Sequence, residues 1–222
     1  MSAQLAAIMP PFRKGAAMLR LVVILAALIQ IAPLPPAYPR VGATKILDNP
    51  RVQVWNIAWL KGQPSPLHRH VYDLVGVYYE PGDRMIISPE GNKRPVSTKA
   101  GDIAFQRKGV THIEEGISDS PLRAVFIEMK DDGPTGRTAA PSEEAPPMSG
   151  IGGKQLLDND RVTVWAYAWG LGMDGPRHRH DRDTVVVWIQ DRTPHAVWVP
   201  AGTVHSEEQT GVISEATIFE LK

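Results

Sequence analysis

Six of the seven histidines in this chain form two sets of three with the same order. The sets are His68, His70 and His112, and His178, His180 and His205. Residues two apart on a β-strand point to the same face, with Cα atoms about 6.5–7 Å apart, so both imidazoles of a His-x-His pair can reach one ion at about 2.0–2.1 Å. Each set therefore predicts a three-nitrogen site for a divalent metal ion.

The donor chemistry limits which metals and reactions fit. Three neutral nitrogens with open coordination positions suit Fe, Zn, Ni, Cu or Mn. The chain has no cysteine, which excludes thiolate metal sites, disulfides and cysteine nucleophiles. No GxSxG elbow, phosphate-binding glycine loop or HExxH motif competes with the histidines as a reaction centre.

The two histidine sets belong to two copies of one structural unit. Residues 47–77 align with residues 157–187 at a constant offset of 110 without a gap, and 17 of the 31 positions are identical. Residues 131–153 are rich in Pro, Gly, Ser and acidic side chains. They form the predicted linker between a first domain at 41–130 and a second at 154–222.

The second copy is the shorter one. Val77 and His112 are 35 residues apart, whereas Val187 and His205 are 18 apart, so the second copy lacks 35 − 18 = 17 residues, enough for a pair of strands. A domain of only 69 residues buries a marginal fraction of its surface. We therefore expect the second copy to be stable only when it packs against the first copy or a partner subunit.

Both copies have the pattern of β-structure. Residues 51–59 and 161–169 combine β-branched and aromatic side chains. Further strands are predicted at 74–79, 84–88, 102–106, 124–129, 184–189, 195–199 and 216–221, with turn sequences between them. Short strands with close turns predict an antiparallel sandwich or barrel.

These segments resemble the two sequence motifs of the cupin superfamily. The matching residues are Gly62, His68, His70, Gly101, Asp102, Gly109 and His112 in the first copy, and Gly172, His178, His180, Pro200, Gly202 and His205 in the second. The second copy is the closer match, because the first has Arg107 where Pro is usual. The resemblance covers about residues 45–130 and 154–222. It implies an all-β fold of two tandem cupin-type jelly-roll (double-stranded β-helix) barrels, the second shortened, an arrangement called a bicupin.

The resemblance also implies a fourth ligand, a Glu three or four residues after the second His, which this chain lacks. Asp73 and Asp183 occur one residue earlier. On an unbroken strand they point away from the histidines, but a β-bulge could redirect them, so they are possible additional ligands. The alternative is that they form salt bridges with adjacent arginines.

Other polar and aromatic residues near the histidines are candidate pocket residues. Gln106, Trp55 and Trp165 are predicted to line a pocket, although the W-x3-W spacing also fits packing between sheets or copies. Four glutamates follow the third histidines. They are Glu114, Glu115, Glu207 and Glu208. Surface charge is their expected role, and a ligand or base is the alternative.

Residues 1–39 are predicted to be a signal peptide or an N-terminal anchor. Basic residues at 13, 14 and 20 precede an apolar run at 21–34, which is shorter than the roughly 20 residues of a membrane span. Prolines at 33, 35 and 36 lie where a cleavage site would be expected, so an uncleaved membrane tether is the alternative. We expect an exported protein, periplasmic or secreted.

Charge and motifs together leave two classes of function. Lys plus Arg and Asp plus Glu are both 24, which gives no electrostatic argument for a nucleic-acid partner. Because cupins with three-His sites include dioxygenases, the resemblance implies a dioxygenase-type or other metal-dependent enzyme acting on a small molecule. The alternative is a non-catalytic cupin binding or interaction module with degenerate metal sites, which holds a small ligand or forms a homodimer. The sequence does not decide between them.

Overall fold

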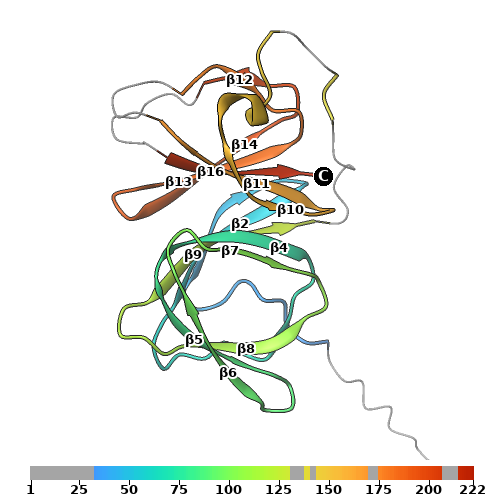
Figure 1. The fold of residues 1–222 in the computed structure, drawn as a ribbon. Helices are drawn as coiled ribbons and strands as arrows, with labels where there is room; N and C mark the ends of the chain where they lie inside the picture. The colour runs from blue at the N-terminus through green and yellow to red at the C-terminus, as the bar shows by residue number, and fades with distance from the viewer. Residues whose placement is uncertain (1–32, 131–137, 141–143, 170–174, 207–214) are drawn as a thin grey trace, which may run out of the picture. The chain divides into compact units, whose positions relative to one another are not determined.

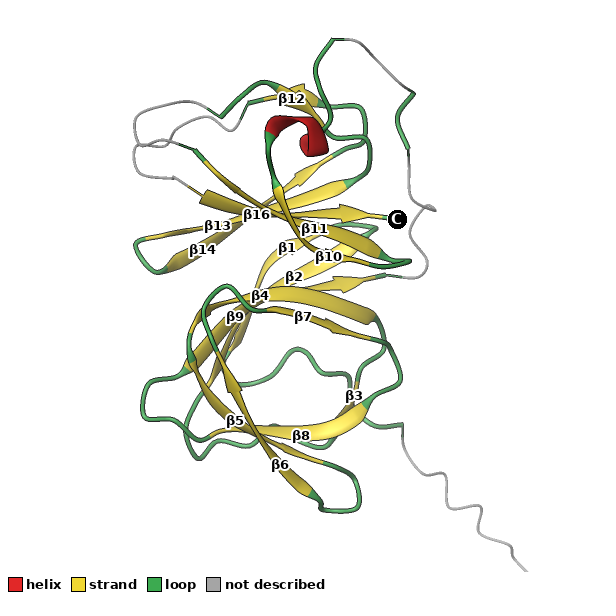
Figure 2. Ribbon diagram, in the orientation of Figure 1, coloured by secondary structure: helices red, strands yellow, loops and turns green. Residues whose placement is uncertain are grey.

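In the computed structural model, the residues described are 33–130, 138–140, 144–169, 175–206 and 215–222. Both copies lie in one compact unit, Leu34–Lys222. Strands dominate it, and η1 (Met148–Ile151) is a single short 3-10 turn (Figure 2). Within the described ranges, no helix has the length and apolar character needed to cross a membrane.

The first half is a barrel of two antiparallel sheets (Figure 1). One sheet has the order β1 (Ala43–Asp48), β2 (Val52–Trp59), β9 (Leu122–Met129), β4 (Asp73–Glu80), β7 (Ile103–Gln106). The other has the order β3 (His68–Arg69), β8 (Thr111–Gly116), β5 (Gly82–Ile87), β6 (Lys93–Thr98). We call this barrel one, and its architecture confirms the predicted jelly roll.

The second half, barrel two, repeats the first sheet strand for strand. Its order is β10 (Lys154–Asp158), β11 (Val162–Ala168), β16 (Glu215–Leu221), β13 (Thr184–Gln190), β14 (Thr193–Val199). Opposite it, the described residues form only β12 (His178–Arg179) and β15 (Val204–His205). The missing 17 residues are the β5–β6 hairpin: β13 turns directly into β14 at Asp191 and Arg192, which have positive φ of 49° and 63°. The predicted loss of a strand pair is therefore confirmed.

A segment before β1 closes barrel one, and we call residues 35–41 the first strap. The Arg69 amide donates to the Pro35 carbonyl at 2.9 Å, and Pro36 forms a parallel bridge with Arg69. Ala37 and Tyr38 are buried among the aromatic side chains inside the barrel. Figure 1 shows the strap, in blue, running between the two sheets. Residues 35–38 therefore pack with barrel one, although they lie within the segment predicted as a leader at 1–39, before the predicted domain start at 41.

Barrel two has a matching second strap at residues 146–151, inside the segment predicted to be linker. The Arg179 amide donates to the Pro146 carbonyl at 2.8 Å, and Pro147 bridges Arg179. Met148, the first residue of η1, is buried against side chains of the large sheet. The end of the predicted linker at 131–153 thus packs into barrel two. Both straps begin with Pro-Pro, so the repeated unit starts earlier than the sequence alignment indicates.

The outer faces of the two large sheets share one hydrophobic core. Its buried residues are Val52, Val54, Val75, Val77, Val125, Ile127 and Met129 from the first half, and Val162, Val164, Val185, Val187, Phe219 and Leu221 from the second. Two ion pairs connect the halves beside this core, and each half contributes one arginine and one aspartate. Arg161 Nε lies 3.0 Å from Asp73 Oδ2, and Arg51 Nε lies 3.8 Å from Asp183 Oδ2. The apolar outer face of the second half is therefore buried by packing against the first half.

We predict that a fragment of residues 144–222 shows no cooperative thermal transition, whereas residues 34–222 do. Burial of each large apolar side chain contributes about 1.5–3 kcal/mol. Separating the halves exposes the six core residues of the second half, which removes about as much as the whole stability of a small domain, about 5–15 kcal/mol. Differential scanning calorimetry of the two fragments tests this. A sharp, reversible endotherm from 144–222 alone would show that barrel two is independent.

Candidate metal centre

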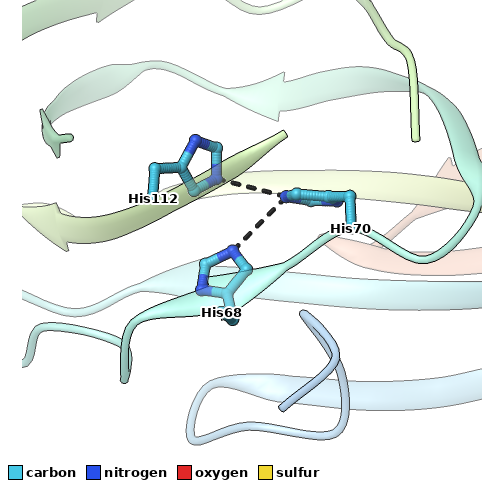
Figure 3. A group of neighbouring side chains, drawn as sticks. All are labelled: His68, His70 and His112. Carbon is cyan, nitrogen blue, oxygen red and sulfur yellow. Dashed lines mark hydrogen bonds between the residues drawn. The ribbon is translucent and has the colours of Figure 1, made fainter. Parts of the chain in front are cut away.

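The first histidine triad lies inside barrel one, at the meeting of two short strands. His68 on β3 pairs directly with His112 on β8, and His70 follows β3. His70 Nε2 lies 3.3 Å from His68 Nε2 and 3.1 Å from His112 Nε2 (Figure 3). All three side chains are buried. The predicted set thus converges on one point.

The second triad repeats this arrangement in barrel two. His178 on β12 pairs with His205 on β15. His180 Nε2 lies 3.1 Å from His178 Nε2 and 2.9 Å from His205 Nε2. His178 and His180 are fully buried, whereas His205 is half-buried. The loss of the β5–β6 hairpin has therefore not dispersed the second triad.

A glycine turn sets the position of the third histidine in each copy. Gly109 and Gly202 have φ of 93° and 85°, a left-handed conformation that side chains strongly disfavour. Their amides donate to the carbonyls of His70 and His180 at 2.7 and 2.8 Å. This bond ties the turn to the His-x-His segment, so the G-x-x-H spacing returns the third imidazole to the other two.

Carbonyl groups select the tautomer of the first histidine in each triad. His68 Nδ1 lies 3.0 Å from the Pro66 carbonyl oxygen, and His178 Nδ1 lies 2.9 Å from that of Pro176. A carbonyl can only accept, so Nδ1 carries the proton and Nε2 presents its lone pair to the triad. This is the tautomer that binds a metal through Nε2.

The distances between the nitrogens fit a shared ion. Nitrogens held about 2.1 Å from one metal lie about 3.0 Å apart at a right angle and about 3.4 Å apart at the tetrahedral angle. The observed 3.1 and 3.3 Å in barrel one lie between these limits. His70 Nε2 has two such neighbours but at most one proton, so without a cation at least one pair of lone pairs faces each other. The residues present therefore fit a divalent metal ion.

The protonation state of the triads also suits metal binding. Burial, followed by the neighbouring imidazoles His112 and His68, lowers the pKa of His70 to about 3. Burial and the two histidines beside it lower the pKa of His180 to about 3 as well. Burial also lowers the pKa values of His68 and His112. The imidazoles of the first triad are thus neutral near pH 7, the form that coordinates metals.

A sequence relationship over a whole domain settles the family. The crystal structure of a cupin domain from Bordetella pertussis Tohama I is 32% identical to this chain, covering 42% of this chain and 98% of that protein, with a TM-score of 0.38. The chain belongs to the cupin superfamily. No protein-family model and no curated protein matches it.

Two further solved structures align with most of the chain. AerE from Microcystis aeruginosa is 12% identical, covers 85% of this chain and 99% of its own, and has a TM-score of 0.52. At that identity the likeness concerns the fold alone. A cupin 2 conserved barrel domain protein from Leptotrichia buccalis is 16% identical over 81% of this chain and 88% of its own, with a TM-score of 0.46.

The two aspartates proposed as additional ligands do not join the cupin triads. Asp73 accepts from the Lys108 amide at 2.8 Å and pairs with Arg161 of the other half. Asp183 accepts from the Ala201 amide at 3.0 Å and lies near Arg51. No bulge occurs at Asp73 on β4, which has the same parity as Val75 and Val77 of the shared core, so Asp73 points to the outer face. Asp183 immediately precedes β13. The salt-bridge alternative is the one observed. Asp73 pairs with Arg161 of the other half and also with Arg107 of its own half, at 3.3 Å, whereas Asp183 lies near Arg51 of the other half.

Glu114 is the residue whose role the sequence prediction misjudged most. It is buried, not a surface charge, and its Oε1 lies 4.0 Å from His112 Nε2. Its Oε2 accepts from Arg40 Nη2 at 3.0 Å and from Trp59 Nε1 at 2.9 Å. Burial raises the pKa of this carboxyl, but Arg84 and Arg40 outweigh it and hold the pKa at about 2. The available signal was its position two residues after His112, on the same face of one strand.

The other glutamates are placed only in part. Glu115 is half-buried on β8, on the opposite face of the strand to Glu114. Glu207 and Glu208 lie outside the described residues.

The predicted pocket residues are mostly core residues. Trp55 stacks on Tyr38 of the first strap at 5.2 Å between ring centroids and donates to Glu128 at 2.9 Å. Trp165 packs in the core of barrel two and donates to Glu220 at 2.8 Å. Gln106 shares a strand face with Ala104, which packs against the interior cluster, so it points inward as expected.

A cleft of about 350 Å³ lies beside His68 of the first triad. It lies between the first strap and the loop that precedes β3, and its wall includes Pro36, Arg40, Trp59, Leu60, Pro66 and His68. The wall is largely apolar, and its polar side chains are Arg40, Gln63, Ser65 and His68. The volume suits a small organic molecule, and of the first triad His68 borders the cleft.

We predict that the metal-free protein loses thermal stability as the pH falls from about 6.5 towards 4.5. His70 and His180 have pKa values of about 3 when folded and about 6.5 when unfolded, so in this window the unfolded chain binds more protons. The midpoint of unfolding, followed by circular dichroism after chelation, should fall across this range. The metal-loaded protein should be less sensitive. A flat profile for the chelated protein would show that the triads are not buried and neutral.

Proposed function

We propose that barrel one binds a divalent metal ion through His68, His70 and His112 and presents it to a small molecule that enters by the cleft. The observation that carries this is the convergence of three Nε2 atoms at metal-bridging distances in a closed interior. The cleft supports it, because His68 borders it. The second triad is a further metal-binding candidate with the same donor set.

An ion held by three neutral nitrogens keeps coordination positions for other donors and supplies Lewis-acid or oxidative chemistry. A dioxygenase-type or other metal-dependent enzyme is therefore the finer proposal. The protein's own part is to orient the imidazoles through Pro66 and the glycine turn, and to exclude bulk water with the first strap.

The non-catalytic alternative has one specific observation in its favour. Glu114 is the carboxylate nearest the first triad among the described residues, and it already accepts two hydrogen bonds. Its pKa of about 2 makes it a weak proton acceptor near pH 7. A reaction that needs a general base would have to recruit it elsewhere, whereas a binding module needs none.

We predict that the purified, untagged protein holds between one and two equivalents of a divalent metal. Changing both His68 and His70 to Ala should remove about one equivalent, because a single remaining imidazole binds weakly. Elemental analysis measures the content. His195→Ala is the matched control, since His195 stacks on Trp188 and belongs to neither triad. Equal metal content in the double variant and the control would contradict the proposal.

Oxygen uptake separates the two classes of function. If the protein is dioxygenase-type, the iron-loaded chain should consume dissolved oxygen when a substrate is added, and the His68→Ala, His70→Ala chain should not. A folded chain that holds metal but shows no turnover of any tested compound would favour the binding module. A folded chain that takes up no metal under any supplementation would contradict both metal proposals.

We also propose that the protein is exported, on the basis of its basic and apolar N-terminal sequence. Any cleavage should leave the first strap in place, because Pro35 and Pro36 bond to Arg69 and Ala37 is buried. N-terminal sequencing of the protein from a periplasmic or secreted fraction tests this. A membrane tether and a homodimer stay predictions.

A further inference from the structure

Barrel one exposes a group of large apolar side chains around β3, at the edge of the barrel where the described chain begins (Figure 2). Leu34, just before the first strap, is 40% exposed, Val71 is 45% exposed and Val110 is 39% exposed. The carbonyl of Pro35, the residue after Leu34, accepts a hydrogen bond from the Arg69 amide at 2.9 Å. The Val110 carbonyl accepts from the residue before Val71, also at 2.9 Å. An exposed apolar group of this kind indicates an interaction surface.

Basic side chains lie among these apolar ones. Arg69 and Lys108 are exposed. Arg69 reaches the turn at Gly109, because its Nη2 lies 3.6 Å from the position that a Cβ atom would take there. The segments that meet here are 34–36, 66–72 and 107–111, and none of them contains an acidic residue. We call this surface the β3 face, and its residues are Leu34, Arg69, Val71, Lys108 and Val110.

Strand parity directs the β3 face away from the first triad. His68 and His70 point into the barrel, so Arg69 and Val71, which alternate with them, point to solvent. Arg107 is the third basic residue nearby, but it pairs with Asp73 and Asp160. The two basic side chains of the β3 face are therefore separate from both the metal site and the contact between the halves.

Barrel two shows that neither the fold nor the triad requires apolar residues here. At the repeat offset, Asp181 takes the place of Val71, and after the glycine turn Thr203 takes the place of Val110. Both replacements are polar, and barrel two still assembles its three histidines. The exposed valines are therefore a separate feature of barrel one.

Barrel two also covers the corresponding side of its own strand β12. Arg179, the counterpart of Arg69, is only 6% exposed, and its Nε donates to Asp181 Oδ1 at 2.7 Å. The Ala139 amide donates to the Asp181 carbonyl at 2.8 Å, so the chain at 138–140 packs against this side. On barrel one, the same side is apolar, basic and exposed.

Two observations favour a lipid surface as the partner of the β3 face. Leu34 is the last residue of the apolar run at 21–34, so this run is continuous in sequence with the face. Basic side chains among exposed aliphatic ones complement anionic headgroups above a hydrocarbon layer. A second copy of this chain fits less well, because a two-fold interface here would bring Arg69 and Lys108 of the two copies together.

We propose that barrel one docks on an anionic membrane surface through the β3 face. Leu34, Val71 and Val110 lie at the boundary between headgroups and acyl chains, and Arg69 and Lys108 lie against lipid phosphates. This goes beyond the proposed membrane tether, because the folded barrel itself contacts the lipid. It does not depend on the metal.

Single cysteines can report on individual positions of the full-length chain, because it contains no cysteine of its own. Val71→Cys and Val110→Cys, each labelled with an environment-sensitive dye, should show a blue shift of the dye emission on vesicles of phosphatidylglycerol and phosphatidylcholine. Val197→Cys is the matched control, because Val197 is 41% exposed on β14 of barrel two. The dye at position 197 should show no shift.

Charge substitutions test the basic part of the β3 face. Arg69→Gln combined with Lys108→Gln should weaken binding to the anionic vesicles by at least about tenfold, because two attractions to lipid phosphates are lost. Lys93→Gln combined with Arg94→Gln is the matched control. It changes the net charge equally, but both residues are exposed on β6, at the opposite edge of the same sheet, so binding should stay unchanged.

Several outcomes would overturn the inference. If the chain binds vesicles but the dye at position 71 does not shift, or shifts no more than the dye at 197, the leader alone tethers the protein. Equal effects of the two charge pairs, or no binding to anionic vesicles, would also refute docking through the β3 face. A shift at position 71 that appears without vesicles and grows with protein concentration would show that a second copy covers the face instead.

Discussion

The site of this protein depends on placing three imidazole Nε2 atoms close together in a closed barrel. Lone pairs at 3.1 and 3.3 Å repel unless a proton or a cation lies between them. The fold must therefore hold the rings in place against that repulsion. It does so with the direct pairing of His68 and His112 across two strands, the Pro66 carbonyl and the turn at Gly109. Barrel two has the same strand pairing, carbonyl contact and glycine turn, so its triad assembles without the two missing strands.

Sequence reasoning succeeded where the information is local. The His-x-His and G-x-x-H spacings predicted both triads, since strand parity and a tight turn fix where those side chains point. The offset between copies also identified the missing hairpin. Strand parity predicted that Asp73 turns away from the triad, but it could not name Arg161, because that partner comes from the other copy.

The failures concern residues whose environment comes from distant segments. Glu114 is buried because Arg40, 74 residues earlier in the chain, supplies its counter-charge. Arg40 is available only because the first strap enters the barrel, and the strap has no periodicity to mark it as structure. The second strap was hidden in a Pro- and Gly-rich stretch for the same reason. Irregular segments that bury a few side chains carry little signal in a single sequence.

The two halves have diverged around one shared core. Val52 and Val162, and the other paired positions of the outer faces, keep the two large sheets together, and the Arg–Asp pairs cross in both directions. Barrel one has meanwhile kept the hairpin that carries Arg84 and has buried two arginines and a glutamate beside its triad. Burying such charges is costly, because each loses its water. A barrel with this interior needs stabilisation from elsewhere, and the apolar face of barrel two provides it. The shortened barrel therefore stabilises barrel one by packing against it. This contribution would favour retention of the second copy even if it catalysed no reaction.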